Sequence, residues 1–491
     1  MGNWEEDELD NPVGCTAWVV NSFISELTVR RTVKITDGEQ APWGVFKDEL
    51  KSAILLDGVE SICNRAFFWF LHLKTVHIPK TVTPIGDEAF VCCESLQCLG
   101  MHDLIEAIGR RAFAGCMFSS ITIPRSVVSF CGNPFIECNC LNEINLSKNT
   151  NFVYVDGVLM DSKKTQIIYC SCLKSGDYSI PSTVTTIYSG AFHRCRRLTS
   201  ITIPSSVKEI RDEVFVGCCS LQSIAITKGN ETLDSNKSSW FRKLFKTKTV
   251  EETPSFTVVD DVLYNTEMTR LIWCSPEKSG SYKIPDTVKV IETKALARGE
   301  KLTEITISDS MTEIAPSTFY GCSGLETVTI PPSVISIGEG AFYNCKALKS
   351  ITLPASVVSI GCRAFCGCSL KAIAIPNSVT SIGDHAFRNC RALTSIDIPD
   401  SVTSIGVYAF SGCTKLKFIT IPESVTSIGC GTFEECVGLR FIEIPRFVHS
   451  IGSNAFGCSR LISITLPDSV VHIGDYAFKD CEMLRSVVFH G

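Results

Sequence analysis

A motif of 22 or 23 residues is repeated along most of this chain. Residues 348–387 show two copies, LKSITLPASVVSIGCRAFCGCSLKAIAIPNSVTSIGDHAF, and the recurring positions are L-x-x-I-x-I-P-x-S-V-x-S-I-G-x-x-A-F-x-x-C. The phenylalanine of the A-F pair returns at Phe319, Phe342, Phe365, Phe387, Phe410, Phe433, Phe456 and Phe478. A fixed period of this length predicts a solenoid, in which each repeat forms one coil and buries its apolar side chains only by stacking on its neighbours.

The same phenylalanine column extends toward the amino terminus. Its earlier members are Phe67, Phe90, Phe113, Phe135, Phe192, Phe215 and Leu296. Counting the column predicts a β-rich solenoid of about fifteen coils over residues 53–491. Residues 1–52 do not follow the motif and are expected to form an N-terminal cap, because the first coil of a solenoid needs a cover. A separate small interaction domain is the alternative for this segment.

Two insertions interrupt the repeats, at residues 151–181 and 228–285. The first contains V-D-G-V-L and Q-I-I-Y-C around a polar turn at residues 161–165, a pattern that predicts a β-hairpin of two strands. Residues 256–285 repeat the pattern, and Phe152 and Phe256 lie 104 residues apart, which indicates that a larger unit was duplicated.

Each recurring position of the motif has an expected role. The I-x-I alternation predicts a short strand with one buried face, and the following proline ends the ladder because it has no N–H to donate. The Ser two residues after the proline is expected to bond backbone groups of the turn through its hydroxyl. The Gly of S-I-G is expected at a corner that requires a positive φ.

The 26 cysteines follow the repeat rather than a disulfide pattern. Twelve of them lie three residues after the column phenylalanine: Cys93, Cys116, Cys138, Cys195, Cys218, Cys322, Cys345, Cys368, Cys390, Cys413, Cys436 and Cys481. One cysteine per coil in one column predicts a buried stack of small apolar side chains. We therefore expect reduced thiols and a reducing compartment.

Composition and motifs exclude several classes of function. The net charge of −6 and the lack of a domain-sized basic block argue against nucleic acid as a partner. No apolar run is long enough for a transmembrane segment, and the acidic start MGNWEEDELDNP lacks the apolar core of a secretory signal, so a cytoplasmic location is expected. The eight histidines are scattered, and the C-x-C and C-C pairs have no second pair at zinc-ligand spacing. No catalytic residue, metal site or cofactor is expected.

The recurring residues I-P-x-S-V-T-S-I-G-x-x-A-F-x-x-C-x-x-L closely resemble those of the BspA-type (Treponema-type) leucine-rich repeat family, over about residues 53–491. The resemblance implies a leucine-rich-repeat solenoid that acts as a protein-interaction module. Members of the family are mostly surface or secreted proteins of bacteria and protists that mediate adhesion and protein binding. This chain departs from that pattern because it shows no signal peptide or anchor.

Two neighbouring coils break the pattern on the exposed side of the strand. The third position of L-x-x-I-x-I is most often Ser, but it is Phe418 and Phe441 in these two coils. Charged residues flank the pair: Lys417 and Arg440 at the second position, Asp397 and Glu443 at the fifth. An exposed aromatic pair beside arginine is typical of a binding hot spot, whereas cross-strand stacking that only stabilises the ladder is the alternative.

Residues 228–255 match no other part of the chain and combine aromatic with basic side chains. Trp240 and Phe241 are candidate binding residues, and at helical spacing residues 237–248 would form a short amphipathic basic helix. Such a helix would make weak contact with a membrane surface or with a partner, and a hairpin extension is the alternative.

The sequence therefore favours a non-enzymatic scaffold that binds a protein partner on its strand face. An exported adhesin-like protein is the second hypothesis, and a catalytic function within residues 1–52 is the third, although this segment is short for an enzyme domain.

Overall fold

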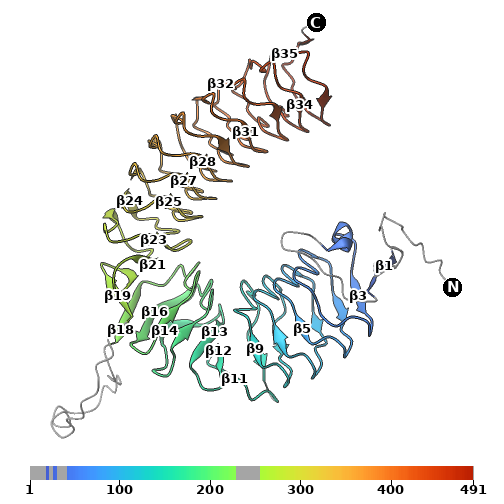
Figure 1. Cartoon of the computed structure of the whole chain (residues 1–491), viewed down its shortest axis with the longest axis vertical. Coiled ribbons are helices and arrows are strands. Elements are labelled where there is room, and N and C mark those ends of the chain that lie inside the picture. The colour runs from blue at the N-terminus through green and yellow to red at the C-terminus, as the bar shows by residue number, and fades with distance from the viewer. Residues whose placement is uncertain (1–17, 22–25, 30–40, 147, 228–254, 490–491) are drawn as a thin grey trace. The chain divides into compact units, whose positions relative to one another are not determined.

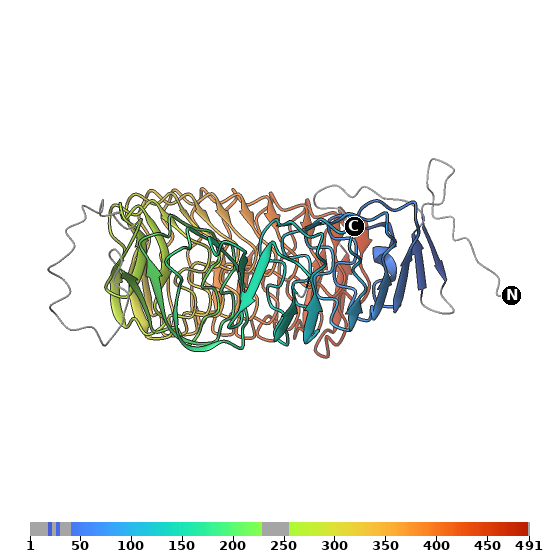
Figure 2. The ribbon, with the colours of Figure 1, turned by 90° about the horizontal axis from the view of Figure 1, so that it is seen from below.

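The computed structural model describes residues 18–21, 26–29, 41–146, 148–227 and 255–489. These residues form short strands and turns, with one 3₁₀ helix, η1 (Pro42–Phe46), in the described part of the chain. The chain divides into two compact units, Met1–Ser255 and Phe256–Gly491. In each unit successive coils stack with their strands side by side (Figure 1, Figure 2), so the predicted β-rich repeat solenoid is confirmed.

Each coil of the first unit contributes to two ladders of strands. The I-x-I segments form the first ladder, whose solvent-exposed side is called the strand face below, and the S-I segments form the second ladder. The strands of the first ladder are β2 (Glu26–Val29), β3 (Ser52–Leu55), β4 (Thr75–His77), β6 (Cys98–Leu99), β8 (Ser120–Thr122), β10 (Glu143–Asn145), β14 (Ser175–Ser179), β16 (Arg197–Pro204) and β18 (Ser223–Thr227), with β1 (Trp18–Asn21) antiparallel to β2. The second ladder contains β5 (Pro84–Ile85), β7 (Ala107–Ile108), β9 (Ser129–Phe130), β15 (Thr186–Ile187) and β17 (Glu209–Ile210).

The second unit repeats this plan with parallel pairing in register. Its first ladder contains β22 (Gly280–Lys283), β24 (Leu302–Thr306), β26 (Thr327–Thr329), β30 (Ser395–Asp397), β32 (Phe418–Thr420), β35 (Ser463–Leu466) and β37 (Ser486–Phe489). Its second ladder contains β23 (Val290–Ile291), β25 (Glu313–Ile314), β27 (Ser336–Ile337), β28 (Ser359–Ile360), β29 (Ser381–Ile382), β31 (Ser404–Ile405), β33 (Ser427–Ile428), β34 (Ser450–Ile451) and β36 (His472–Ile473).

The insertions contain three strands each, not the two predicted. The first insertion forms an antiparallel sheet in which each strand pairs with the next one along the chain: β11 (Phe152–Val155), β12 (Val158–Asp161) and β13 (Gln166–Cys170). The second insertion forms the same arrangement with β19 (Phe256–Val259), β20 (Val262–Asn265) and β21 (Arg270–Cys274). The additional turn falls at Asp156 and Gly157, where both φ angles are positive, as a two-residue hairpin turn requires. The predicted turn at residues 161–165 is present, and Asp161 Oδ1 closes it by accepting hydrogen bonds from the backbone N–H groups of Thr165 and Gln166 at 2.6 Å.

The described part of the chain contains about eighteen coils, compared with about fifteen counted from the column. In the insertion coils, Cys170 and Cys274 take the place of phenylalanine. Their N–H groups donate to the carbonyls of Ala191 (2.7 Å) and Ala295 (2.9 Å) in the next coil, as the N–H of a column phenylalanine does. The remaining coil holds the last strand, β37. A count based on aromatic residues therefore misses these coils.

The phenylalanine column is the centre of the core. Phe342, Phe365 and Phe387 are fully buried, and their rings stack nearly parallel at centroid distances of 5.3 and 5.5 Å. At the amino-terminal end of the first unit, Trp43 packs 6.1 Å from Phe67 and donates its Nε1–H to the carbonyl of Ala66 at 2.8 Å. This contact agrees with a covering role for the segment before the repeats, although a cap that ends at residue 52 stays a prediction.

The expected role of the S-I-G glycines is wrong. Their φ angles are not positive; in the regular coils the positive φ values occur two residues before and two after the column phenylalanine, as at Arg363 and Gly367 around Phe365. The S-I-G glycines instead allow close approach between coils. A Cβ on Gly406 would lie 2.4 Å from the backbone nitrogen of Asp384 in the preceding coil, and one on Gly383 would lie 2.5 Å from that of Cys362.

The recurring hydroxyls and thiols bond the preceding coil. Ser378 Oγ donates to the carbonyl of Val357 at 2.6 Å, so the predicted hydroxyl bond to a turn connects two coils. In the cysteine column, the thiol of Cys390 donates to the carbonyl of Phe365 at 3.1 Å, and equivalent bonds recur in the other regular coils. The column thiols are therefore hydrogen-bond donors as well as small apolar side chains, and the described cysteines are free thiols.

Burial predicts that the column thiols are protected from alkylation. Desolvation raises the pKa of Cys322 and of Cys436 to about 12, so almost no reactive thiolate exists near neutral pH. We expect iodoacetamide at about pH 8 to modify the exposed Cys140 and Cys430 in the native protein but not Cys322 or Cys436. Mass spectrometry of tryptic peptides measures this, and denaturant should make all four react. Equal labelling in the native protein would show that the column is accessible.

Candidate functional site

The strand face of the second unit carries the two predicted aromatic residues on neighbouring coils. Phe418 opens β32, where it pairs with Ser395 of β30, and Phe441 occupies the same position in the next coil. The I-x-I alternation directs Ile419 into the core and leaves Phe418 and Thr420 exposed on either side of it. Phe418 is 72% exposed and Phe441 62% exposed, so both rings lie in solvent.

The two rings do not stack on other aromatic groups of the described chain. Elsewhere in this unit, side chains in equivalent positions of adjacent coils do stack, as Tyr320 and Tyr343 do at 4.7 Å between centroids. The exposed faces of Phe418 and Phe441 are therefore available to a ligand.

Charged side chains border the aromatic pair on two opposite sides. Lys417 and Arg440 precede the phenylalanines and are exposed at the amino-terminal border of the strand face. Asp397 and Glu443 are exposed at the fifth position; Asp397 pairs with Thr420 of the next coil, and Glu443 pairs with Thr465. Within the described residues, none of these four charges forms an ion pair.

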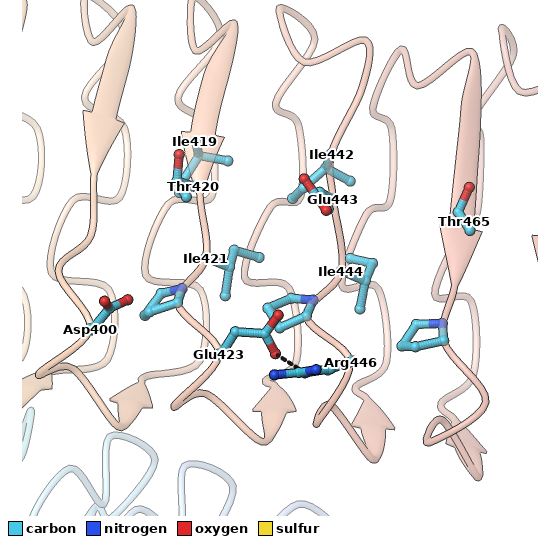
Figure 3. A pocket seen from close by; sticks show the side chains of 13 residues that line it. Asp400, Ile419, Thr420, Ile421, Glu423, Ile442, Glu443, Ile444, Arg446 and Thr465 are labelled. Carbon is cyan, nitrogen blue, oxygen red and sulfur yellow. Dashed lines mark ion pairs between the residues drawn. The ribbon is translucent and has the colours of Figure 1, made fainter. Parts of the chain in front are cut away.

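A groove of about 750 Å³ lies at the carboxyl-terminal border of the same strands (Figure 3). Ile419 and Ile442, which directly follow Phe418 and Phe441 in the sequence, are among its lining residues. Its walls come from Asp400, Ile419, Thr420, Ile421, Pro422, Glu423, Ile442, Glu443, Ile444, Pro445, Arg446, Thr465 and Pro467. The prolines recur one above another because each strand ends at the I-P step. Glu423 and Arg446 form an ion pair of 3.5 Å across two coils at the edge of this groove.

The prediction from sequence missed the residues at this border. Phe447 is 49% exposed and lies 5.0 Å from the guanidinium of Arg446, which is placed over its ring. The motif has Ser at this position, as at Ser424 and Ser469, so Phe447 is a third break in the pattern that could have been found. Asp400 and Arg446 carry no such signal, because both occupy a position that varies from coil to coil.

The second set of candidates lies outside the described residues. This applies to Trp240, Phe241 and the whole basic segment 237–248, so the amphipathic helix and its membrane contact stay predictions. Within the described residues there is no helix long and apolar enough to cross a membrane, and no group of three or more side chains suited to hold a metal ion.

Comparison with known proteins agrees with this architecture. The family model described as "BspA type Leucine rich repeat region (6 copies)" matches residues 46–158, 164–279, 274–394 and 380–491. No curated protein sequence matches the chain.

Several bacterial proteins of known structure are similar to this chain. One from Eubacterium ventriosum ATCC 27560 is 21% identical, with 90% of this chain and 92% of that chain covered and a TM-score of 0.40. A leucine rich cell surface protein from Faecalibacterium prausnitzii A2-165 is 24% identical, with coverages of 84% and 95% and a TM-score of 0.38. The pneumococcal vaccine antigen PcpA is 16% identical, with 95% of both chains covered and a TM-score of 0.32. The family model matches most of the length of this chain, and the chain therefore belongs to the BspA-type leucine-rich repeat family.

Proposed function

We propose that this protein is a non-enzymatic interaction scaffold that binds a partner protein on the strand face around Phe418 and Phe441. The observation that carries the proposal is the exposure of both rings on neighbouring coils, in a column where Ser is the most frequent residue. Exposed aromatic groups beside a groove and next to Arg440 have the composition of a binding hot spot.

The roles of the recurring polar residues support a scaffold rather than an enzyme. Leucine-rich repeat solenoids are typically non-enzymatic. The hydroxyl of Ser378 and the thiol of Cys390 are typical of their columns, and both donate to backbone carbonyls of the preceding coil. The potential nucleophiles of the motif are thus used to hold coils together.

We expect the double variant Phe418→Ser/Phe441→Ser to fold normally and to lose its partner. Both side chains are mostly exposed, so their removal should change the free energy of unfolding by less than about 0.5 kcal/mol. Loss of two hot-spot side chains of about 2 kcal/mol each should weaken binding by several hundred-fold or more. The measurement is affinity capture from the native host followed by titration of the captured partner.

A matched control is Ile335→Ser/Val358→Ser. These two residues are also exposed apolar side chains on neighbouring coils, at 53% and 45%, but they directly precede the second-ladder strands β27 and β28 and do not lie on the strand face. The control should retain the partner. If the Phe418→Ser/Phe441→Ser variant retains the same partners with the same affinity, the strand-face site is wrong.

The second candidate function is an exported adhesin-like protein that binds host or extracellular proteins. It is supported by the family, whose members are often cell-surface proteins. Three asparagines, Asn145, Asn230 and Asn236, stand in the sequence pattern Asn-x-Ser/Thr that is glycosylated in exported proteins. Asn145 is exposed at the end of β10, and the other two lie outside the described residues. Glycans at these sites and disulfides in protein isolated from its host would support export, whereas unmodified asparagines and reduced cysteines would support the cytoplasmic location.

A further inference from the structure

The charges around Phe418 and Phe441 are separated by sign. The amino-terminal border of the strand face is basic in consecutive coils, with exposed Lys371, Arg391, Lys415, Lys417, Arg440 and Arg460. The carboxyl-terminal border is mainly acidic, with exposed Asp397, Asp400, Glu423, Glu443 and Asp468. The aromatic pair lies between the two borders, so this face is basic, then apolar, then acidic along the direction of its strands.

The opposite charges do not neutralise each other. Arg440 and Glu443 lie three residues apart on one coil, about 10 Å along an extended chain, and Lys417 and Asp400, at the second and eighth positions of neighbouring coils, lie about 20 Å apart. The ion pair formed at the acidic border joins Glu423 to Arg446, 3.5 Å apart, and it leaves Asp397, Asp400 and Glu443 without an ion pair within the described residues. Such unpaired charges cost little in water and are available to a ligand.

A ligand of a single charge fits only one border. An anionic membrane surface or a nucleic acid would be attracted by Lys417 and Arg440 but repelled by Asp397 and Glu443. A uniformly basic partner would be attracted by Asp397 and Glu443 but repelled by Lys417 and Arg440. A ligand whose own charges are separated by an apolar centre matches both borders and the phenylalanines at once.

We propose that this face binds an extended polypeptide segment with acidic residues at one end, an apolar centre and basic residues at the other end. The acidic end lies on Lys417 and Arg440, the apolar centre contacts Phe418 and Phe441, and the basic end reaches Asp397, Asp400 and Glu443 beside the groove. About three extended residues span the distance from the basic border to Asp397 and Glu443, and about six reach Asp400. This inference rests on the proposed function and adds the chemistry of the partner.

The test uses the full chain and three fluorescent synthetic peptides that share one apolar centre. The first is acidic–apolar–basic, the second has the same composition with charges alternating at both ends, and the third is basic–apolar–basic. We expect the unaltered chain to prefer the first peptide over the second by roughly 5- to 10-fold in low salt, and by less in about 0.5 M salt, because exposed charge pairs are weak and screened. The measurement is fluorescence anisotropy.

A charge-reversed variant gives the complementary experiment. The unaltered chain should bind the acidic–apolar–basic peptide more tightly than the basic–apolar–basic one. The variant Lys417→Glu/Arg440→Glu should show the opposite order and bind the basic–apolar–basic peptide more tightly. Both side chains are exposed, and unchanged thermal unfolding verifies the fold. Equal binding of all three peptides, no binding of any, or no reversal in the variant would overturn the inference.

The Phe418→Ser/Phe441→Ser variant separates the two proposals. If peptides bind the unaltered chain without regard to their charge order and this variant loses them, the charge inference fails while the proposed function stands. If this variant binds partner and peptides as the unaltered chain does, the proposed function fails as well. Binding of phosphatidylserine vesicles or RNA that depends on Lys417 and Arg440 would also contradict a polypeptide ligand.

Discussion

Replacement of Phe387 by alanine is expected to lower the free energy of unfolding of the second unit by about 3–5 kcal/mol. Phe387 is fully buried, and its ring stacks between Phe365 at 5.5 Å and Phe410 at 5.4 Å. Its removal leaves a cavity that borders two coils. Neighbouring coils cannot close this cavity easily, because their spacing is set by the parallel strand ladders.

Urea unfolding followed by circular dichroism measures this effect, and amide hydrogen exchange shows where it acts. A repeat array can unfold in parts, so the loss of protection should be largest in the coils of Phe365, Phe387 and Phe410. The matched control is Phe418→Ala, which removes the same side chain from an exposed position and should change stability by less than about 0.5 kcal/mol. Similar effects of the two variants would mean that the column is not the centre of the core.

Alanine at Gly406 is expected to destabilise the stack by about 1–3 kcal/mol, as overpacking does. The added Cβ would lie 2.4 Å from the nitrogen of Asp384 and 2.5 Å from the carbonyl carbon of Gly383, both backbone atoms of the preceding coil. The coil cannot move away without stretching the bond from Gly406 N–H to the carbonyl of Ile382, which is 2.8 Å long. The clash therefore separates coils or strains them.

The next coil supplies a control in the same column. At Gly429 an added Cβ would meet Val407 Cγ1 at 3.3 Å and Thr432 Oγ1 at 3.4 Å, both side-chain atoms that can shift. Neither glycine has a positive φ, so alanine fits the backbone conformation at both positions. The stabilisation that alanine brings by restricting the unfolded chain is therefore the same for both variants. Gly429→Ala should thus leave the urea midpoint nearly unchanged while Gly406→Ala lowers it. A loss as large for Gly429→Ala would point to backbone conformation rather than contact between coils.

The wrong prediction for these glycines has a physical reason. A glycine in a turn signals either a positive φ or a close approach, and one repeat does not distinguish the two. Which one applies depends on the backbone of the adjacent coil. The positive φ values fall instead at positions such as Arg363 and Tyr408, where a long side chain gives no sign of the strained backbone.

The residues of the candidate site also divide into those that the sequence indicated and those that only the structure revealed. Phe418 and Phe441 could be found from sequence because each places a large aromatic side chain in a column where Ser is the most frequent residue. Asp400, Glu423 and Arg446 could not, since their position varies and only the stacking of coils brings them to one groove. The ion pair of Glu423 and Arg446 joins residues 23 positions apart, the length of one coil.

The sequence by itself determined the solenoid, its period and its buried columns, because a side chain that recurs every 22 or 23 residues meets its equivalent in the next coil. Only the tertiary structure decided that Cys170 and Cys274 replace phenylalanine in the insertion coils, that the thiols donate to backbone carbonyls, and that the glycines serve contact between coils. Those properties belong to pairs of coils. A single repeat specifies which side chains are apolar, but the distances between stacked backbones exist only once the coils have assembled.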